Sequence, residues 1–199
     1  MSLQRRKSPV QARSKAVAEA LVEATARVLA ADGYRGATTR RIAEVAGVSV
    51  GSLYQYFPNK EALVFAVAER HFADVLGRLA AVDVSGGRPL RDAVTGFVEA
   101  MVEAHALDAG VHRALSEQML HLGLEPYLEH QRRAEGAVRM LLELKRDEIR
   151  VERLGIASWL LVTTVEGAVH RSLLDDPSRL EDPGFVEELV ALVCRYLGV

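Results

Sequence analysis

The chain has 199 residues, of which 49% are hydrophobic and 26% charged, and this composition indicates a globular protein of one or two domains. Its single cysteine, Cys194, excludes a disulfide framework and a cysteine-based zinc site. No apolar run reaches the roughly 18–20 residues that a membrane span needs, and the basic first ten residues lack the apolar region of a signal peptide. We therefore expect a cytoplasmic protein with no membrane partner.

Charge is distributed unevenly along the sequence. Residues 1–60 carry 10 lysines and arginines against 4 acidic residues, whereas residues 61–199 carry 15 against 23. A basic N-terminal part followed by an acidic remainder favours a polyanionic partner for the N-terminal part alone. The alternative is an uneven surface charge that serves no partner.

Three helices are predicted in the N-terminal part. The first runs from about Ser8 to Ala31, and Asp32-Gly33 provides a stop signal. Thr38 or Thr39 is a suitable N-cap for a second helix at 40–46, which Gly47 ends. Ser49 is a suitable N-cap for a third helix at 50–57, which ends at Pro58-Asn59.

Helical periodicity continues over the rest of the chain, and no long segment has the period of two that a half-buried strand shows. A long helix is expected from Lys60 to about Ala81, followed by a Gly- and Pro-rich linker at 84–89. Further helices are predicted at 90–107, 111–122, 126–146, 151–174 and 183–197. The sequence thus predicts an all-α fold of about nine helices, with one domain at 1–58 and a C-terminal helical bundle at 59–199.

Two short helices joined by a short turn that contains glycine form a helix-turn-helix, and here the turn is Gly47-Val48-Ser49. We expect Ile42, Val45 and Leu53 to pack the pair, which leaves hydroxyl and amide groups of the second helix exposed for base edges and phosphates. The predicted DNA-binding residues are Thr39, Arg40, Val50, Gly51, Ser52, Tyr54, Gln55, Tyr56 and Lys60. The alternative is a helical hairpin inside an ordinary bundle.

The stretch "TTRRIAEVAGVSVGSLYQYFPNKEAL" (38–63), preceded by "LAADGYRGATT", resembles the DNA-binding signature of TetR-family transcriptional repressors. The resemblance covers about residues 12–65 and implies that the set above contacts DNA, with Val50 and Gly51 at the tip of the recognition helix. The C-terminal part agrees with the family only in the number and lengths of its helices. The resemblance also implies a homodimer, because a two-fold protein binds a palindromic double-stranded operator.

The last two predicted helices are the candidate pairing surface. Residues 155–164 are apolar nearly all round, and the final helix carries a full aliphatic stripe, so both need covering on more than one side. A four-helix interface between two subunits would cover them, and a monomer core is the alternative. The predicted dimer contacts are Gly167, His170, Leu174, Phe185, Leu189 and Val193.

Methionines, aromatics and isolated polar residues in the intervening helices indicate an adaptable apolar pocket for a small-molecule effector. The predicted ligand-binding residues are Phe97, Met101, His105, Leu115, Met119, Tyr127, Trp159, Thr163 and Glu166, although each taken alone fits a core position equally well. Glu166 would be costly to bury unpaired, and His170 lies one helical turn further on as a structural partner.

An enzyme is the second class of protein to consider. His112, Glu117 and His121 lie close in sequence but lack a spacing such as H-E-x-x-H, and Ser116 lacks a G-x-S-x-G setting. We therefore expect no catalytic residue, no metal ligand and no cofactor. The predicted function is a ligand-responsive repressor that binds operator DNA as a homodimer and is released by a small molecule. A DNA-binding regulator without such a ligand and a helical enzyme are the alternatives.

Overall fold

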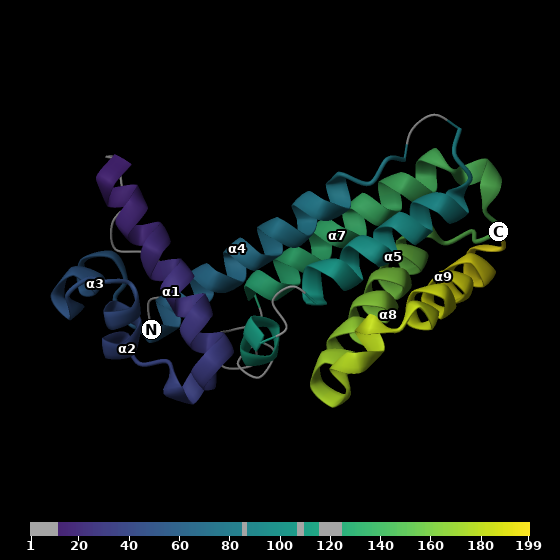
Figure 1. Cartoon of the computed structure of the whole chain (residues 1–199). Helices are drawn as coiled ribbons and strands as arrows, with labels where there is room; N and C mark the ends of the chain where they lie inside the picture. The colour runs from purple at the N-terminus through teal and green to yellow at the C-terminus, as the bar shows by residue number, and fades with distance from the viewer. Residues whose placement is uncertain (1–11, 85–86, 107–109, 116–124) are drawn as a thin grey trace. The chain divides into compact units, whose positions relative to one another are not determined.

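A computed structural model describes residues 12–84, 87–106, 110–115 and 125–199 of the chain. These residues form eight bounded α-helices, two short 3-10 helices and a helical segment at 110–115, with no strand among them. The α-helices are α1 (Ala12–Gly36), α2 (Thr39–Val45), α3 (Val50–Tyr56), α4 (Lys60–Ala80), α5 (Leu90–Ala106), α7 (Glu125–Leu144), α8 (Leu154–Asp175) and α9 (Pro183–Leu197), and the 3-10 helices are η1 (Arg146–Glu148) and η2 (Pro177–Glu181) (Figure 1). The prediction of an all-α fold is confirmed.

Most helix bounds agree with the sequence signals within one to three residues, and the bounds of α9 agree at both ends. The largest difference is in α1, which continues past the expected end at Ala31. Gly33 nevertheless leaves the helical conformation with φ of 64°, so the predicted stop signal is present as a break before one more turn. The predicted helix at 111–122 is described only up to residue 115.

The described residues divide into two compact units. Unit 1 comprises residues 12–72 together with the helical segment at 110–115, and unit 2 comprises 73–106 and 125–199. The division falls inside α4, so this helix contributes residues to both units. The domain boundary predicted at residue 58 lies between α3 and α4 and stays a prediction.

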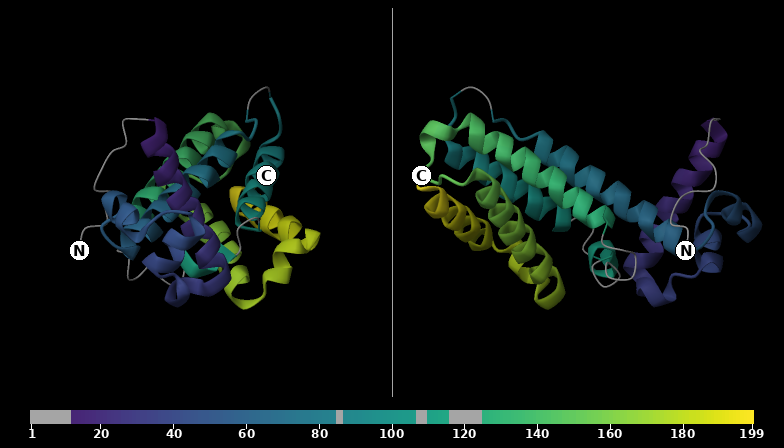
Figure 2. Two further views of the ribbon diagram at one scale, coloured as in Figure 1. Left: turned by 60° about the vertical axis from the view of Figure 1, so that its left-hand side comes forward. Right: turned by 180° about the vertical axis from the view of Figure 1, so that it is seen from behind.

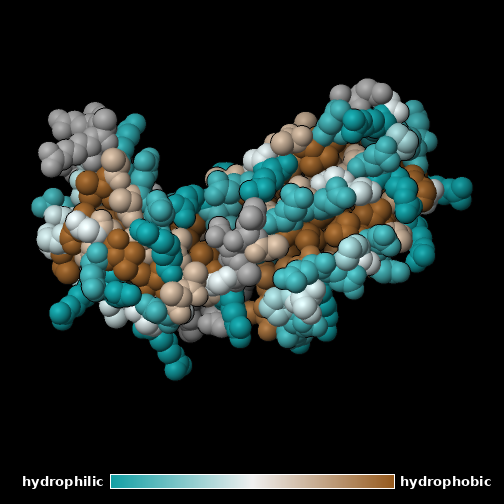
Figure 3. Space-filling view, viewed as in Figure 1, coloured by the Kyte–Doolittle hydropathy of each residue, from teal (hydrophilic) through white to brown (hydrophobic). Residues whose placement is uncertain are grey.

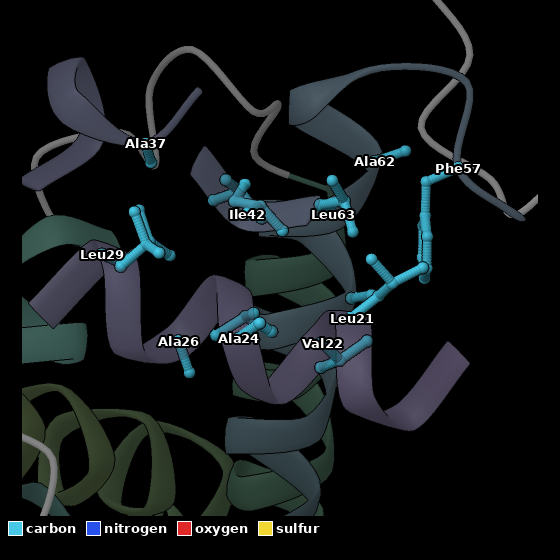
Figure 4. Packing of buried hydrophobic residues seen from close by; sticks show 14 of the residues in the cluster. Leu21, Val22, Ala24, Ala26, Leu29, Ala37, Ile42, Phe57, Ala62 and Leu63 are labelled. Carbon is cyan, nitrogen blue, oxygen red and sulfur yellow. The ribbon is translucent and has the colours of Figure 1, made fainter. Parts of the chain in front are cut away.

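The core of unit 1 is built around α1. Leu21 and Leu29 of α1 are fully buried together with Ile42 of α2, Leu53 of α3 and Leu63 of α4. Figure 4 shows Ile42 and Leu63 side by side over α1, with Phe57 at one end of the cluster. Full burial of a leucine or phenylalanine side chain contributes about 1.5–3 kcal/mol to the free energy of folding. The shared cluster therefore holds α2 and α3 against α1.

The segment at 110–115 completes that core from a distant part of the sequence. Val111, Ala114 and Leu115 are buried in the same hydrophobic cluster as the α1 leucines. Gly110 lies so close to α1 that a Cβ atom at this position would be 3.1 Å from Cα of Ala30. Unit 1 is therefore discontinuous in sequence.

Unit 2 is a helical bundle in which α7 packs along α8, and α5 contacts both α8 and α9 (Figure 2). The start of α9 is fixed by Asp182, whose side chain accepts a hydrogen bond from the Gly184 backbone N–H at 2.9 Å, with Pro183 in the first turn. Figure 3 shows hydrophobic residues in a band along these C-terminal helices, with hydrophilic residues on either side. Among the described helices none is both long and apolar enough to cross a membrane.

Candidate functional site

Two capped helices and a glycine turn position the predicted recognition helix. The Thr38 hydroxyl accepts a hydrogen bond from the Arg41 N–H at 3.2 Å, and the Ser49 hydroxyl accepts one from the Ser52 N–H at 3.0 Å. Between the helices, Gly47 has φ of +69°, a left-handed conformation that costs an L-residue about 1–2 kcal/mol. The turn is closed by a hydrogen bond from the Val48 N–H to the Ala43 carbonyl at 3.0 Å. The start of α3 is thus determined by local sequence.

The two faces of α3 differ in exposure as the sequence predicts. Leu53 is fully buried, whereas the solvent-exposed fractions of Tyr54 and Val50 are 41% and 38%. Gly51 and Gln55 are exposed as well. The exposed face of α3 therefore presents a phenol, an amide and a small apolar side chain, which are suitable groups for base edges and the thymine methyl.

Other members of the predicted DNA-binding set take part in contacts within unit 1. The hydroxyl oxygens of Thr39 and Tyr54 lie 3.3 Å apart, and those of Ser49 and Ser52 lie 2.9 Å apart. The Ser14 hydroxyl donates to the Tyr56 hydroxyl oxygen at 3.3 Å, and Tyr56 packs partly against the core. Tyr56 thus has a structural role beside any contact with DNA, while Arg40 is exposed at the start of α2.

Lys60, at the start of α4, is held against Tyr34. Its ammonium group donates a hydrogen bond to the Tyr34 carbonyl at 3.0 Å and lies 3.8 Å from the centre of the Tyr34 ring. Burial and the neighbouring Glu61 carboxylate raise the pKa of the Tyr34 phenol, whose hydroxyl donates to Glu61 at 3.4 Å. The ammonium group of Lys60, which we expect to contact phosphate, therefore also holds the start of α4 against the end of α1.

The predicted ligand-binding residues are divided among different environments. In unit 2, Met101 and His105 of α5 and Glu166 of α8 are buried, and Phe97 is half-buried. Trp159 is 51% exposed and Thr163 is exposed as well, so these two lie on the outer face of the chain. Leu115 belongs to the core of unit 1. Met119 and the Tyr127 side chain lie outside the described residues.

Glu166 is the central polar group inside unit 2. The Gln131 amide of α7 donates a hydrogen bond to one carboxylate oxygen, and Nε2 of His130 lies 3.9 Å from the other. Burial raises the pKa of Glu166 to about 7, against the smaller opposing effect of the Gln131 hydrogen bond. Burial, followed by nearby His170 and Arg133, lowers the pKa of His130 to about 4. The imidazole of His130 is therefore neutral at pH 7.

His170 has a different partner from the one suggested by its spacing to Glu166. Its Nε2 atom lies 3.0 Å from Nε2 of His105, and the ring centres are 4.9 Å apart. The other ring nitrogen of His105, Nδ1, lies 2.7 Å from the Met101 carbonyl oxygen. Burial lowers the pKa of His170 to about 4. Sequence reasoning missed His130 and Gln131, because neither stands in a recognisable pattern on α7.

The predicted dimer contacts are also divided. Gly167 is exposed and Leu174 is 41% exposed on α8, and Phe185 is half-buried. Leu189 and Val193 are buried within unit 2, where α9 packs against α5, and His170 faces His105. Besides Leu174, the exposed large apolar residues of the last two helices are Ile156, Trp159, Leu192 and Tyr196.

Two sequence profiles match the chain. The profile "Tetracyclin repressor-like, C-terminal domain" matches residues 89–197, more than half of the chain, and "Bacterial regulatory proteins, tetR family" matches residues 21–67. The chain belongs to the tetR family. The second match contains α2, the glycine turn and α3, which confirms the resemblance stated from the sequence. Because members of this family are regulators, the expectation that the chain is not an enzyme is confirmed as well.

Curated relatives match over part of their length. The transcriptional repressor KstR of Mycolicibacterium smegmatis is 33% identical over 69 residues, which cover 35% of this chain and 34% of KstR. The transcriptional repressor AcnR of Corynebacterium glutamicum is 36% identical over 70 residues, covering 34% of this chain and 37% of AcnR. The matches therefore span about a third of the length of these family members.

Solved structures of similar fold cover nearly the whole chain. A transcriptional regulator from Rhodococcus sp. Rha1 superposes with a TM-score of 0.75 at 22% identity, covering 92% of this chain and 98% of its own. The fatty acid degradation regulator FadR from Bacillus halodurans has a TM-score of 0.74 at 18% identity, covering 94% and 96%. At these identities the likeness establishes the fold of this family member.

The residues considered for an enzyme do not form a described catalytic group. His112 is buried in unit 1 and contacts His71 edge to face, with ring centres 3.8 Å apart. Ser116, Glu117 and His121 lie outside the described residues. Family membership, rather than this partial geometry, decides against catalysis.

Proposed function

We propose that this tetR-family chain is a transcriptional repressor that binds a palindromic operator as a homodimer and is released by a small molecule. The observation that carries the proposal is the exposure of Tyr54 and Gln55 on α3 above a fully buried Leu53. A packing helix has no need of exposed base-contacting groups at the end of a capped turn, whereas a recognition helix does. Two relatives of the chain are named as repressors.

The homodimer is supported by the outer faces of α8 and α9. The solvent-exposed fractions of Trp159, Leu192 and Tyr196 are 51%, 47% and 40%. Large apolar residues that remain exposed on neighbouring helices favour coverage by another protein surface. A second copy of the chain fits this need, because a two-fold pair places two recognition helices about 34–36 Å, or a multiple of this, along DNA.

Release by a small molecule would act through a shift in the population of conformations. The effector would contact the interior of unit 2 near Phe97 and Met101 of α5. Helix α4 contributes residues to both units, and we infer that it carries the change to the recognition helices. An effector changes operator affinity only as far as it binds one conformation more tightly than the other.

Selection of genomic DNA fragments by the purified protein tests the first part of the proposal, and an enriched palindrome is the expected result. Screening compounds for release of the selected fragment tests the second part. A failure to enrich any palindrome contradicts the repressor. Operator binding that no bound compound alters supports the alternative of a regulator without a small-molecule ligand.

A further inference from the structure

A carboxylate is buried between two helices of unit 2. Glu166 of α8 is 4% exposed, and its side chain meets residues of α7, the helix that packs along α8. The Gln131 amide donates a hydrogen bond to Oε2 of Glu166, and Nε2 of His130 lies 3.9 Å from Oε1. Oε2 therefore has a hydrogen-bond donor, whereas the imidazole nitrogen is beyond hydrogen-bond distance of Oε1.

The described groups around this carboxylate do not balance its charge. Gln131 is neutral, and burial, followed by His170 and Arg133, lowers the pKa of His130 to about 4. Burial also lowers the pKa of His170, one turn further along α8, to about 4. Arg133 is exposed and forms an ion pair with Glu129, with the two atoms 2.6 Å apart. At pH 7 neither of the described side chains that contact the carboxylate carries a positive charge.

A carboxylate in such a place discriminates between classes of ligand. Burial without a balancing charge disfavours the ionised acid and raises the pKa of Glu166 to about 7, so that both forms are present near neutral pH. A positive charge brought to Oε1 would stabilise the ionised form, and a negative one would be repelled by it. A purely apolar ligand would leave the cost of burying the carboxylate unchanged.

The spacing of Oε1 and the imidazole nitrogen admits one bridging donor. When its proton is on Nδ1, the neutral ring of His130 presents a lone pair at Nε2. Hydrogen bonds of about 2.8–2.9 Å from a single nitrogen to both atoms would enclose an angle of roughly 86°. This angle is close enough to the tetrahedral one for two N–H bonds of an ammonium group to point at both acceptors within about 15° of linear.

We propose that the effector of this chain carries a protonated amine on an apolar body, and that its ammonium group donates hydrogen bonds to Glu166 and His130. The apolar body fits the surroundings, because Val162 and Val169, about one turn before and after Glu166 on α8, are both buried. This inference rests on the proposed function, since it names the chemical class of the effector.

Binding of an ammonium group would displace the proton of the Glu166 carboxyl group into solvent. The ionised fraction of an acid with a pKa of about 7 rises about tenfold between pH 6 and pH 8, and an alkylamine keeps its charge over this range. The apparent affinity for the amine should therefore rise about tenfold over the same interval. At pH 7 about half a proton should be released for each amine bound, which calorimetry in buffers of different ionisation enthalpy measures.

Three probes with one phenethyl body test the class of ligand. Phenethylamine is cationic, phenethyl alcohol is neutral and hydrocinnamate is anionic at pH 7. In calorimetric titration of the full-length chain without DNA, we expect saturable binding of the amine, at least about tenfold tighter than that of the alcohol, with hydrocinnamate the weakest. Equal affinities for the amine and the alcohol, or no saturable binding of the amine, would overturn the proposal.

Variants assign the contact. Glu166→Gln nearly keeps the size of the side chain and removes its charge, so it should weaken phenethylamine binding at least about tenfold, abolish its pH dependence and leave alcohol binding unchanged. Ser158→Ala is the matched control, because it removes another buried polar group of α8 whose hydroxyl donates to the Gly155 carbonyl at 3.1 Å. Circular dichroism selects variants that remain folded, and the proton release of the unaltered chain tests the contact without a variant. A folded Glu166→Gln protein that binds the amine as tightly as the Ser158→Ala protein overturns the assignment.

The operator separates this proposal from the proposed function. Release of the selected operator by phenethylamine supports the amine as the class of effector, and binding of the amine without release overturns that role. Enrichment of a palindrome by a chain that does not bind the amine overturns the amine proposal alone. Amine binding by a chain that enriches no palindrome contradicts the repressor and still supports recognition of an amine by Glu166.

Discussion

The hydroxyl groups of Thr39 and Tyr54 lie 3.3 Å apart and join the first residue of α2 to the exposed face of α3. Tyr54 therefore stands where it can contact a base while its ring orientation is held by the preceding helix. We expect Tyr54→Ala to weaken binding to the selected operator by about 1–3 kcal/mol and to relax specificity at one base pair. Fluorescence anisotropy on matched and single-substituted operators measures both effects.

The contribution of the hydroxyl pair can be separated from that of the ring. Tyr54→Phe and Thr39→Val each remove one partner, and the double variant should lose less affinity than the sum of the two single losses. Fully additive losses would show that the two hydroxyl groups act on DNA independently.

Lys60 should affect both folding and binding. Lys60→Met removes the hydrogen bond to the Tyr34 carbonyl and the contact with the Tyr34 ring, so we expect a loss of about 1–2 kcal/mol in the free energy of unfolding. It should also weaken binding to all DNA sequences about equally. The slope of log affinity against log salt concentration should become shallower by about one. Urea denaturation and anisotropy over a range of salt concentrations test these effects. An unchanged unfolding free energy would contradict the structural role.

The turn between α2 and α3 depends on the conformation of one glycine. Gly47→Ala should lower the free energy of unfolding by about 1–2 kcal/mol, because φ of +69° places the added Cβ in a strained region. Gly77→Ala is the matched control, since Gly77 lies in the interior of α4 and an added Cβ would meet no atom within 4 Å. The control should raise stability by about 0.5–1 kcal/mol. Equal effects of the two variants in urea denaturation would contradict the prediction.

Introducing charged side chains tests whether the exposed apolar face of α8 and α9 is the dimer interface. Trp159→Glu and Leu192→Glu should shift the protein towards monomer in light scattering and lower its operator affinity, because a buried unpaired carboxylate disfavours the interface. Met140→Glu on α7 is the control, since Met140 is 71% exposed and lies on a different helix. Should Met140→Glu dissociate the protein while the other two do not, the interface lies on α7.

Local signals explain why the bounds of α2 and α3 agree with the sequence prediction. Thr38 and Ser49 are caps that act within three residues of themselves, and Gly47 has the positive φ that its turn requires. Such features depend on neighbouring residues, so they can be recognised in the sequence without knowledge of the tertiary packing. Leu53 and Ile42 follow from helical periodicity in the same way.

The interior of unit 2 could not be predicted, because its partners are distant in sequence. Helix α8 is apolar nearly all round in its first half, so periodicity does not identify Trp159 as an outward residue. The sequence suggests His170 as the partner of Glu166, one turn away. In the structure Gln131 holds Glu166 and His105 faces His170, and both contacts require the packing of α7 and α5 on α8.

Residues 110–115 supply part of the core that also contains Leu53 of α3, from outside the first 72 residues. A fragment that ends at Phe72 would lack Val111, Ala114 and Leu115, and the surfaces of α1 that they cover would meet water. An exchange of DNA-binding heads between regulators of this family would therefore have to transplant two separate pieces of chain together. Gly110 would have to accompany them, because an added Cβ atom would lie 3.1 Å from Cα of Ala30, closer than an ordinary van der Waals contact. The stability of the first three helices therefore depends on side chains that follow them by about fifty positions.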